Sequence, residues 1–159
     1  MRLFKKRQTA SDLGAAVFQA VLAIPPESKF RHSDREFVEL VIFRAFAADH
    51  TLWLAIRDEI LRDRIRTQFN RELVTFLQRN PWHPDPLRLF QERFVAYQKA
   101  VNTPDHNGPA FALSSQFVRF WQRTNDEDLD IFDVVEATME YKALFETVLD
   151  VIRSVKIAG

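Results

Sequence analysis

Acidic side chains are the residues of this chain best suited to do chemistry. Nine of them fall between residues 126 and 150, where a single lysine is the only basic residue. Carboxylates at alternate positions can bind Ca²⁺ in an EF-hand loop, which needs Gly at its sixth position and Glu at its twelfth. Counted from Asp126, these positions hold Ile131 and Ala137, so the sequence excludes this loop.

Three of the acids, Asp133, Glu136 and Glu140, recur at helical spacing and therefore share one helix face. Such a face could hold a divalent ion or contact a basic partner protein. It could also be a solvated surface, or be matched by arginines elsewhere in the same chain. We predict that the three acids are exposed and bind a partner protein, and we expect no metal and no other cofactor.

The four histidines do not form a recognisable catalytic pattern. None has Glu three residues before it, as a carboxylate-bridged di-iron bundle requires. His83 lies near Asp85 and His106 follows Asp105, and an acid–histidine pair could act as a general base. No nucleophile elbow accompanies either pair. We therefore favour a non-enzymatic protein, and predict that Trp82 and His83, in a proline-rich connector, also contact the partner.

Glycine is scarce and cysteine is absent from the sequence. The three glycines are Gly14, Gly108 and Gly159. Walker and Rossmann nucleotide sites need several glycines in one loop, so both are excluded. The lack of cysteine excludes disulfides, thiolate metal sites and a cysteine nucleophile. The 93 residues between the first two glycines favour helices over strands joined by tight turns.

Charge is balanced over the whole chain but not along it. Residues 1–80 hold 14 Lys and Arg against 10 Asp and Glu, and residues 81–159 hold 8 against 12. We expect the two halves to complement each other within one fold. The arginine-rich stretch 57–72 is interleaved with acids, so it predicts a salt-bridged helix and no nucleic-acid partner.

The N-terminus predicts a basic, flexible tail over residues 1–10. A basic tail beside an amphipathic helix could bind an anionic membrane surface, which is one alternative function. The basic residues that would do so are Arg2, Lys5, Lys6 and Arg7.

We expect neither a signal peptide nor a transmembrane span. Asp12 precedes the apolar run 13–24 and Gln19 interrupts it, which does not suit a signal peptide. The most apolar window, 37–56, contains three charged residues, and each charge at a bilayer centre costs about 2.5–3.5 kcal/mol. These features predict a cytoplasmic protein.

Phenylalanine is unusually frequent, with 15 residues. Aromatic stripes at helical spacing usually fill a helical core. They could also line a cavity for a small apolar ligand, which is a second alternative function. The residues assigned to that cavity are Phe90, Phe94, Phe117 and Phe120.

Breaks and caps divide the chain into six predicted helices, which form a single all-α bundle over 11–159. The stretch 34–79 has no Gly or Pro, but one helix of that length would measure about 70 Å, so we expect a break at 49–51. Ser11, Ser33, Asp85 and Asp128 or Asp130 are the expected caps. The predicted helices cover 11–24, 34–48, 51–79, 86–102, 110–124 and 129–156.

The helix over 34–48 is predicted to lie at the centre of the bundle, because ten of the twelve residues from 37 to 48 are apolar. Arg44 would then be buried, and a buried guanidinium needs a carboxylate partner. We predict Glu136 or Glu140 for this role.

In the last predicted helix, the apolar stripe that starts at Ile131 and Val135 is expected to face the core. Together these features predict a helical interaction module, such as an adaptor, assembly or inhibitor-type protein, with an acidic face on its C-terminal helix. Its expected partner is another protein, with self-association as an open alternative.

Overall fold

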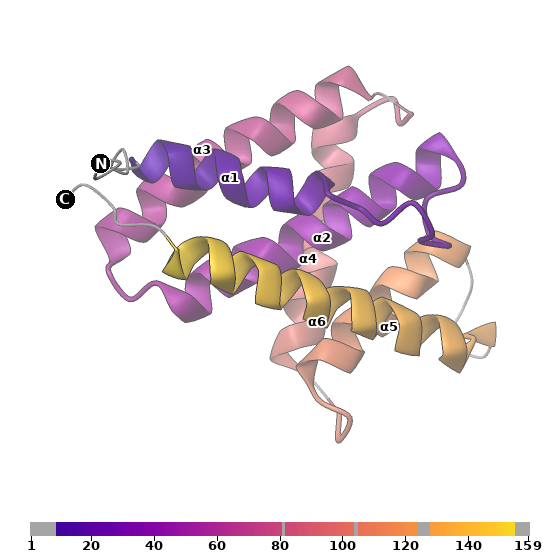
Figure 1. The fold of residues 1–159 in the computed structure, drawn as a ribbon. Helices are drawn as coiled ribbons and strands as arrows, with labels where there is room; N and C mark the ends of the chain where they lie inside the picture. Colours follow the sequence, from indigo (N-terminus) through magenta and orange to yellow (C-terminus); the bar gives the residue numbers. More distant parts are fainter. Residues whose placement is uncertain (1–8, 81, 104, 124–127, 155–159) are drawn as a thin grey trace.

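The computed structural model describes residues 9–80, 82–103, 105–123 and 128–154. Over these ranges the chain forms six α-helices and no strand, which confirms the predicted all-α bundle (Figure 1). The helices are α1 (Ala10–Leu22), α2 (Asp34–Ala55), α3 (Glu59–Arg79), α4 (Pro86–Asn102), α5 (Pro109–Gln122) and α6 (Ile131–Arg153).

Helix α2 forms the centre of the bundle, as predicted. Every residue from 38 to 49 is buried, and α2 contacts each of the other five helices. In Figure 1, α1 and α6 lie in front of α2 and α4 lies behind it. A helix that is apolar on all sides can be stable only in such a position, because neighbours must cover its whole circumference.

The predicted break at 49–51 is wrong, because α2 continues to Ala55. Two polar side chains in this stretch have partners within the fold: Thr51 donates to the Ala47 carbonyl oxygen at 2.8 Å, and Asp49 pairs with Arg66 of α3. The chain turns at residues 56–58 instead. There the Asp58 side chain accepts a hydrogen bond from the Leu61 backbone and caps α3.

The other helix starts agree with the sequence except at α1. The predicted caps Ser33, Asp85 and Asp130 each accept a backbone hydrogen bond at the start of their helices. Helix α1 is capped by Thr9 and not by Ser11, because Thr9 and Asp12 bond reciprocally in a capping box.

Gly14 lies buried where α1 crosses α3, the most extensively packed pair of helices. A Cβ atom at this position would lie 2.4 Å from the Ile65 carbonyl oxygen and 2.9 Å from the Gln68 Cβ. Both distances are shorter than van der Waals contact, and one involves the backbone of α3. The glycine therefore sets how closely α1 and α3 approach.

We expect Gly14→Ala to lower the free energy of unfolding by about 1–3 kcal/mol, because the added methyl group forces the two helices apart. Alanine is the better helix former by about 1 kcal/mol, which makes a net loss informative. Urea unfolding followed by circular dichroism measures the change. Gln19→Ala on the exposed side of α1 is the control and should stay within about 0.5 kcal/mol. A stability gain in Gly14→Ala would contradict the close approach.

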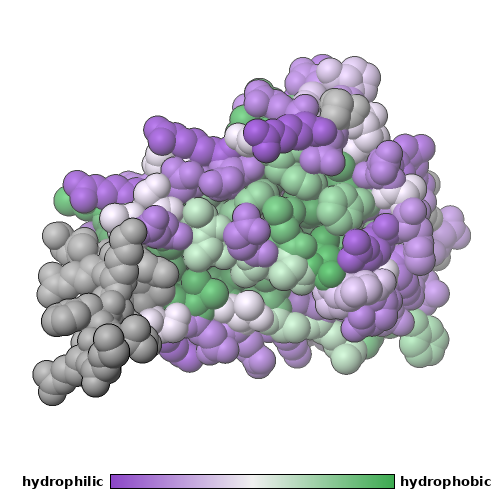
Figure 2. All heavy atoms as spheres, turned by 45° about the horizontal axis from the view of Figure 1, so that its top comes forward, coloured by the Kyte–Doolittle hydropathy of each residue, from purple (hydrophilic) through white to green (hydrophobic). Residues whose placement is uncertain are grey.

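Apolar residues also reach the surface of the bundle. On the face shown in Figure 2, hydrophobic residues gather in the middle and hydrophilic residues border them. Large exposed apolar side chains concentrate at the start of α6 and where α2 passes into α3. The described residues of this kind are Trp53, Leu54, Ile60, Leu87, Val95, Ile131, Phe132, Val135 and Met139.

Candidate interaction surface

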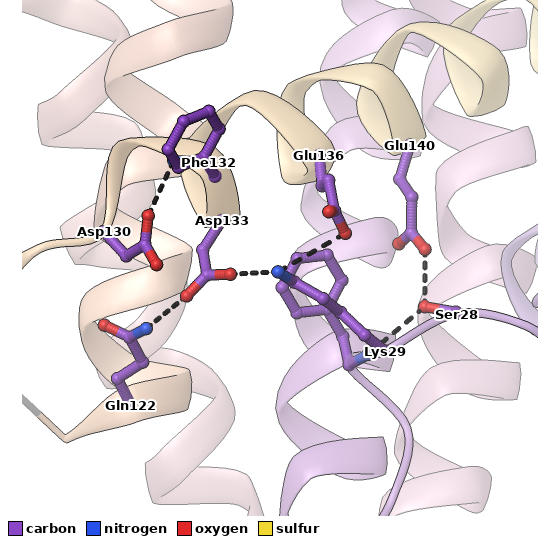
Figure 3. A network of polar contacts seen from close by, with 9 residues as sticks. Ser28, Lys29, Gln122, Asp130, Phe132, Asp133, Glu136 and Glu140 are labelled. Atoms are coloured by element: carbon purple, nitrogen blue, oxygen red, sulfur yellow. Dashed lines mark hydrogen bonds and ion pairs between the residues drawn. The ribbon is translucent and has the colours of Figure 1, made fainter.

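The segment between α1 and α2 lies against α6 and engages its acidic residues (Figure 3). Asp133 is buried, and its two carboxylate oxygens accept hydrogen bonds from the Lys29 ammonium group and the Gln122 side-chain amide. The hydrogen bond and the charge of Asp133 raise the pKa of Lys29, while burial lowers it. Asp133 therefore joins α5, α6 and the α1–α2 segment.

Glu136 and Glu140 differ in exposure and in the contacts that their carboxylates make within the chain. Glu136 lies 3.4 Å from the Lys29 Nζ and keeps 52% of its side chain exposed. Glu140 accepts a hydrogen bond from Ser28 Oγ at 2.5 Å, and its other oxygen is buried without a hydrogen-bond partner in the described part of the chain. Burial raises the pKa of Glu140, against the opposing effects of Ser28 and Arg44.

The prediction of three exposed acids is therefore wrong for Asp133, which is buried, and for Glu140, which is half-buried. Both carboxylates find partners within the same chain, which is one of the alternatives stated above for the acidic face. Their partners are Lys29 and Ser28, however, and not arginines. Ser28 and Lys29 lie before α2, more than a hundred positions in the sequence from the acids that they bind, so no local pattern indicates them. Glu136 is exposed, as predicted.

Arg44 is buried, but its hydrogen-bond partners are not the predicted carboxylates. Its guanidinium donates to the carbonyl oxygens of Val21 at 2.8 Å, Ala20 at 3.2 Å and Ala23 at 3.4 Å. These carbonyls belong to the end of α1, where backbone acceptors lack partners in their own helix. Burial lowers the pKa of Arg44 and the charge of Glu140 raises it, so Glu140 acts on Arg44 at longer range.

The first half of α6 carries an apolar stripe on its outer side. Phe132 is 73% exposed and Met139 is 64% exposed, although both are large hydrophobic residues. The prediction that Ile131 and Val135 face the core is wrong, because the helix turns Val134 inward instead. We call this surface the α6 apolar stripe, formed by Ile131, Phe132, Val135 and Met139.

The α6 apolar stripe lies in strongly acidic surroundings. The sequence from 124 to 141 contains seven acidic residues and no lysine or arginine. Asp128, Asp130 and Glu136 are exposed beside the stripe, and Lys29 pairs with Glu136 and the buried Asp133. The stripe therefore combines exposed apolar side chains with a negative rim.

The structure does not bring Trp82 and His83 together with the acids of α6. They lie at the α3–α4 connection, near the top of Figure 1, whereas α6 crosses the lower middle of the molecule. Trp82 is half-buried against the core, and its ring contacts that of His83 edge-on, with 5.4 Å between centroids. His83 Nδ1 accepts a hydrogen bond from the Asp85 backbone at 3.1 Å. Both side chains thus contribute to the fold of their own connector.

The four phenylalanines of the predicted ligand cavity pack against other aromatic rings. Phe117 is buried and stacks on Phe43 with 4.3 Å between centroids, and Phe90 contacts Phe94 edge-on at 4.4 Å. Phe120 lies beneath the Arg93 guanidinium at 3.9 Å. Three hollows found among the described residues have other linings. A ligand cavity at these phenylalanines remains a prediction.

Other predicted features concern the N-terminus, metals and membranes. Arg2, Lys5, Lys6 and Arg7 lie outside the described residues. In the part of the chain that the structure covers, no three His, Asp or Glu side chains cluster closely enough to hold a metal ion. None of the described helices has the length and apolar character needed to cross a bilayer.

Comparison of the chain with protein-family models, with curated proteins and with solved structures finds no match.

Proposed function

We propose that this protein is a non-enzymatic interaction module that binds a partner protein through the α6 apolar stripe. The exposure of Phe132 is the observation that carries the proposal. An exposed aromatic ring gains more from burial against a partner than most other side chains do, and aromatic residues dominate the energetics of interfaces. The neighbouring contacts support the same proposal, since Asp133 and Glu140 of α6 bond to Lys29 and Ser28 and leave Phe132 exposed.

The spacing of the stripe favours a helical or extended apolar segment as the bound element. Phe132, Val135 and Met139 follow each other at intervals of three and four, so they form one ridge along α6. The same side of the helix continues with Lys142 and Glu146, both exposed, so the apolar part ends at mid-helix. Its length matches about two turns of a partner helix.

The acidic rim favours a partner whose apolar residues are bordered by lysine or arginine. Complementary charge raises the association rate and rejects acidic competitors. A symmetric dimer through this stripe would place Asp128, Asp130 and Glu136 of one copy beside those of the other, because a two-fold interface uses the same patch twice. The charge therefore favours a different protein over self-association.

Phe132→Asp is expected to weaken partner binding by about 30-fold or more, which corresponds to about 2 kcal/mol for the loss of a central aromatic contact. The thermal midpoint should hardly change, because the side chain is exposed. Affinity purification from the native source, with mass spectrometry, first identifies proteins retained by the wild type, and titration calorimetry then measures their affinity.

Val95→Asp is the matched control, since Val95 is equally exposed but lies on α4. Proteins retained by the wild type and by Val95→Asp but lost with Phe132→Asp support the proposal. Retention of the same proteins by all three would contradict it. Analytical ultracentrifugation of the wild type tests self-association directly, and a dimer abolished by Phe132→Asp would replace the partner by a second copy.

A further inference from the structure

The chain between α1 and α2 is fastened to two neighbouring helices. We call residues 23–33 the α1–α2 segment. Phe30 in this segment is 1% exposed, and its ring packs edge-on against Phe117 and Trp121 of α5, with 5.2 and 4.9 Å between the ring centroids. Two polar side chains just before Phe30 bond to acidic residues of α6 (Figure 3). The segment therefore connects α5 and α6 to the start of the central helix.

One of the acids that hold this segment, Glu140, is poorly placed for a charged carboxylate. One of its oxygens lies 2.5 Å from Ser28 Oγ, and the other is buried without a hydrogen-bond partner among the described residues. A buried charge that lacks hydrogen bonds is costly, whereas an unpaired neutral oxygen costs much less. The contact with Ser28 suits both forms, because a hydroxyl group can donate to a carboxylate or accept from a neutral carboxyl group.

The charges around Glu140 compensate it only in part. Arg44 of α2 acts on it from a distance, because its guanidinium already donates to carbonyl oxygens at the end of α1. Two like charges oppose the carboxylate: Glu136, one turn earlier on α6, and Glu27 in the α1–α2 segment. Helices α1 and α5 also pack against α6, but within the described part of the chain they add no titratable group that acts on Glu140.

The protonation of Glu140 is therefore linked to folding. Burial and the two like charges raise its pKa, while Ser28 and Arg44 lower it. Because the pKa is higher in the folded protein than in the unfolded chain, proton uptake by Glu140 stabilises the folded state. This stabilisation is complete below the pKa of the unfolded chain and is lost as the pH rises through the pKa of the folded protein.

We propose that the α1–α2 segment and α6 form a proton-sensitive contact, in which the neutral form of Glu140 holds the segment against α6 and the charged form weakens that hold. The contact between Lys29 and Asp133 has the opposite requirement, since it needs a charged carboxylate. A variant that changes Glu140 alone therefore separates the two effects. The proposal does not depend on a protein bound at the α6 apolar stripe.

Urea unfolding of the wild type and of Glu140→Gln, from about pH 5 to about pH 8, tests the proposal. Glutamine has the shape and the neutrality of a protonated glutamate, so the variant should unfold at a higher urea concentration than the wild type at the alkaline end. The difference between the two midpoints should shrink on acidification, because the wild-type side chain then takes up its proton. A variant that is less stable than the wild type at the alkaline end, or that differs from it equally at every pH, would overturn the proposal.

Glu146→Gln is the matched control, because it removes the same charge from an exposed position on the same helix. Its midpoint should differ from that of the wild type by the same amount at every pH. Hydrogen–deuterium exchange followed by mass spectrometry then locates the effect: at the alkaline end, residues 23–33 should exchange more slowly in Glu140→Gln than in the wild type. Equal exchange of this segment in the two proteins would overturn the proposal, as would the same pH dependence in Glu146→Gln.

Discussion

Arg93→Ala is expected to lower the free energy of unfolding by about 3–5 kcal/mol, because it leaves the buried carboxylate of Glu39 without its partner. The Glu39 side chain is 1% exposed and lies in α2, at the centre of the bundle. Arg93 of α4 donates to it through Nε at 3.0 and 3.1 Å and through a terminal nitrogen at 2.7 Å. Few single substitutions away from the core would be so costly.

The loss of stability in Arg93→Ala should come from the unpaired, buried charge of Glu39 and not from the absence of the ion pair itself. Glu39→Leu/Arg93→Leu removes both charges and keeps apolar volume, so we expect it to be more stable than Arg93→Ala. Arg88→Ala is the matched control: Arg88 also pairs with an acid, Glu92, but on the exposed side of α4, and its loss should cost less than about 1 kcal/mol. Urea unfolding measures all three, and equal losses in Arg93→Ala and Arg88→Ala would contradict the buried-charge explanation.

Arg44→Ala is expected to be similarly destabilising, by about 3–5 kcal/mol, for a different reason. The Arg44 guanidinium caps the C-terminal end of α1 by donating hydrogen bonds to three backbone carbonyl oxygens. Without it these acceptors lose their donor inside the protein, and each unsatisfied buried group costs about 1–3 kcal/mol. The truncation also leaves a cavity between α1 and α2.

Arg44→Met separates the two contributions, because methionine fills the volume without donating hydrogen bonds. We expect it to lose about 2–3 kcal/mol, less than Arg44→Ala but well short of neutral. Arg57→Ala removes an exposed arginine and should stay within about 0.5 kcal/mol. Wild-type stability in Arg44→Met would show that the carbonyls at the end of α1 do not need this donor.

The α6 apolar stripe, with its acidic rim, is the surface that we propose for a basic apolar segment of another protein. The helical core is held by Arg44 and by the Glu39–Arg93 pair.

The sequence alone determined the class of fold and most of the helix starts. Ser33, Asp85 and Asp130 act as caps because capping depends on side chains that lie two or three residues from the backbone they bind. The burial of α2 could also be predicted from the sequence, since an unbroken apolar stretch must be packed against neighbours on every side. These features are local, so a single sequence contains them.

Only the tertiary structure decided which side chains stay exposed. Ile131 and Val134 could each have started the buried stripe of α6, and the partners of Asp133 lie elsewhere in the chain, on α5 and before α2. Asp49, where the helix break was predicted, is likewise paired with Arg66, which lies seventeen residues later in the sequence. Exposure depends on contacts between residues far apart in the sequence, whereas periodicity and caps describe each helix by itself. The acidic face was therefore visible in the sequence, while its apolar neighbour on the surface was not.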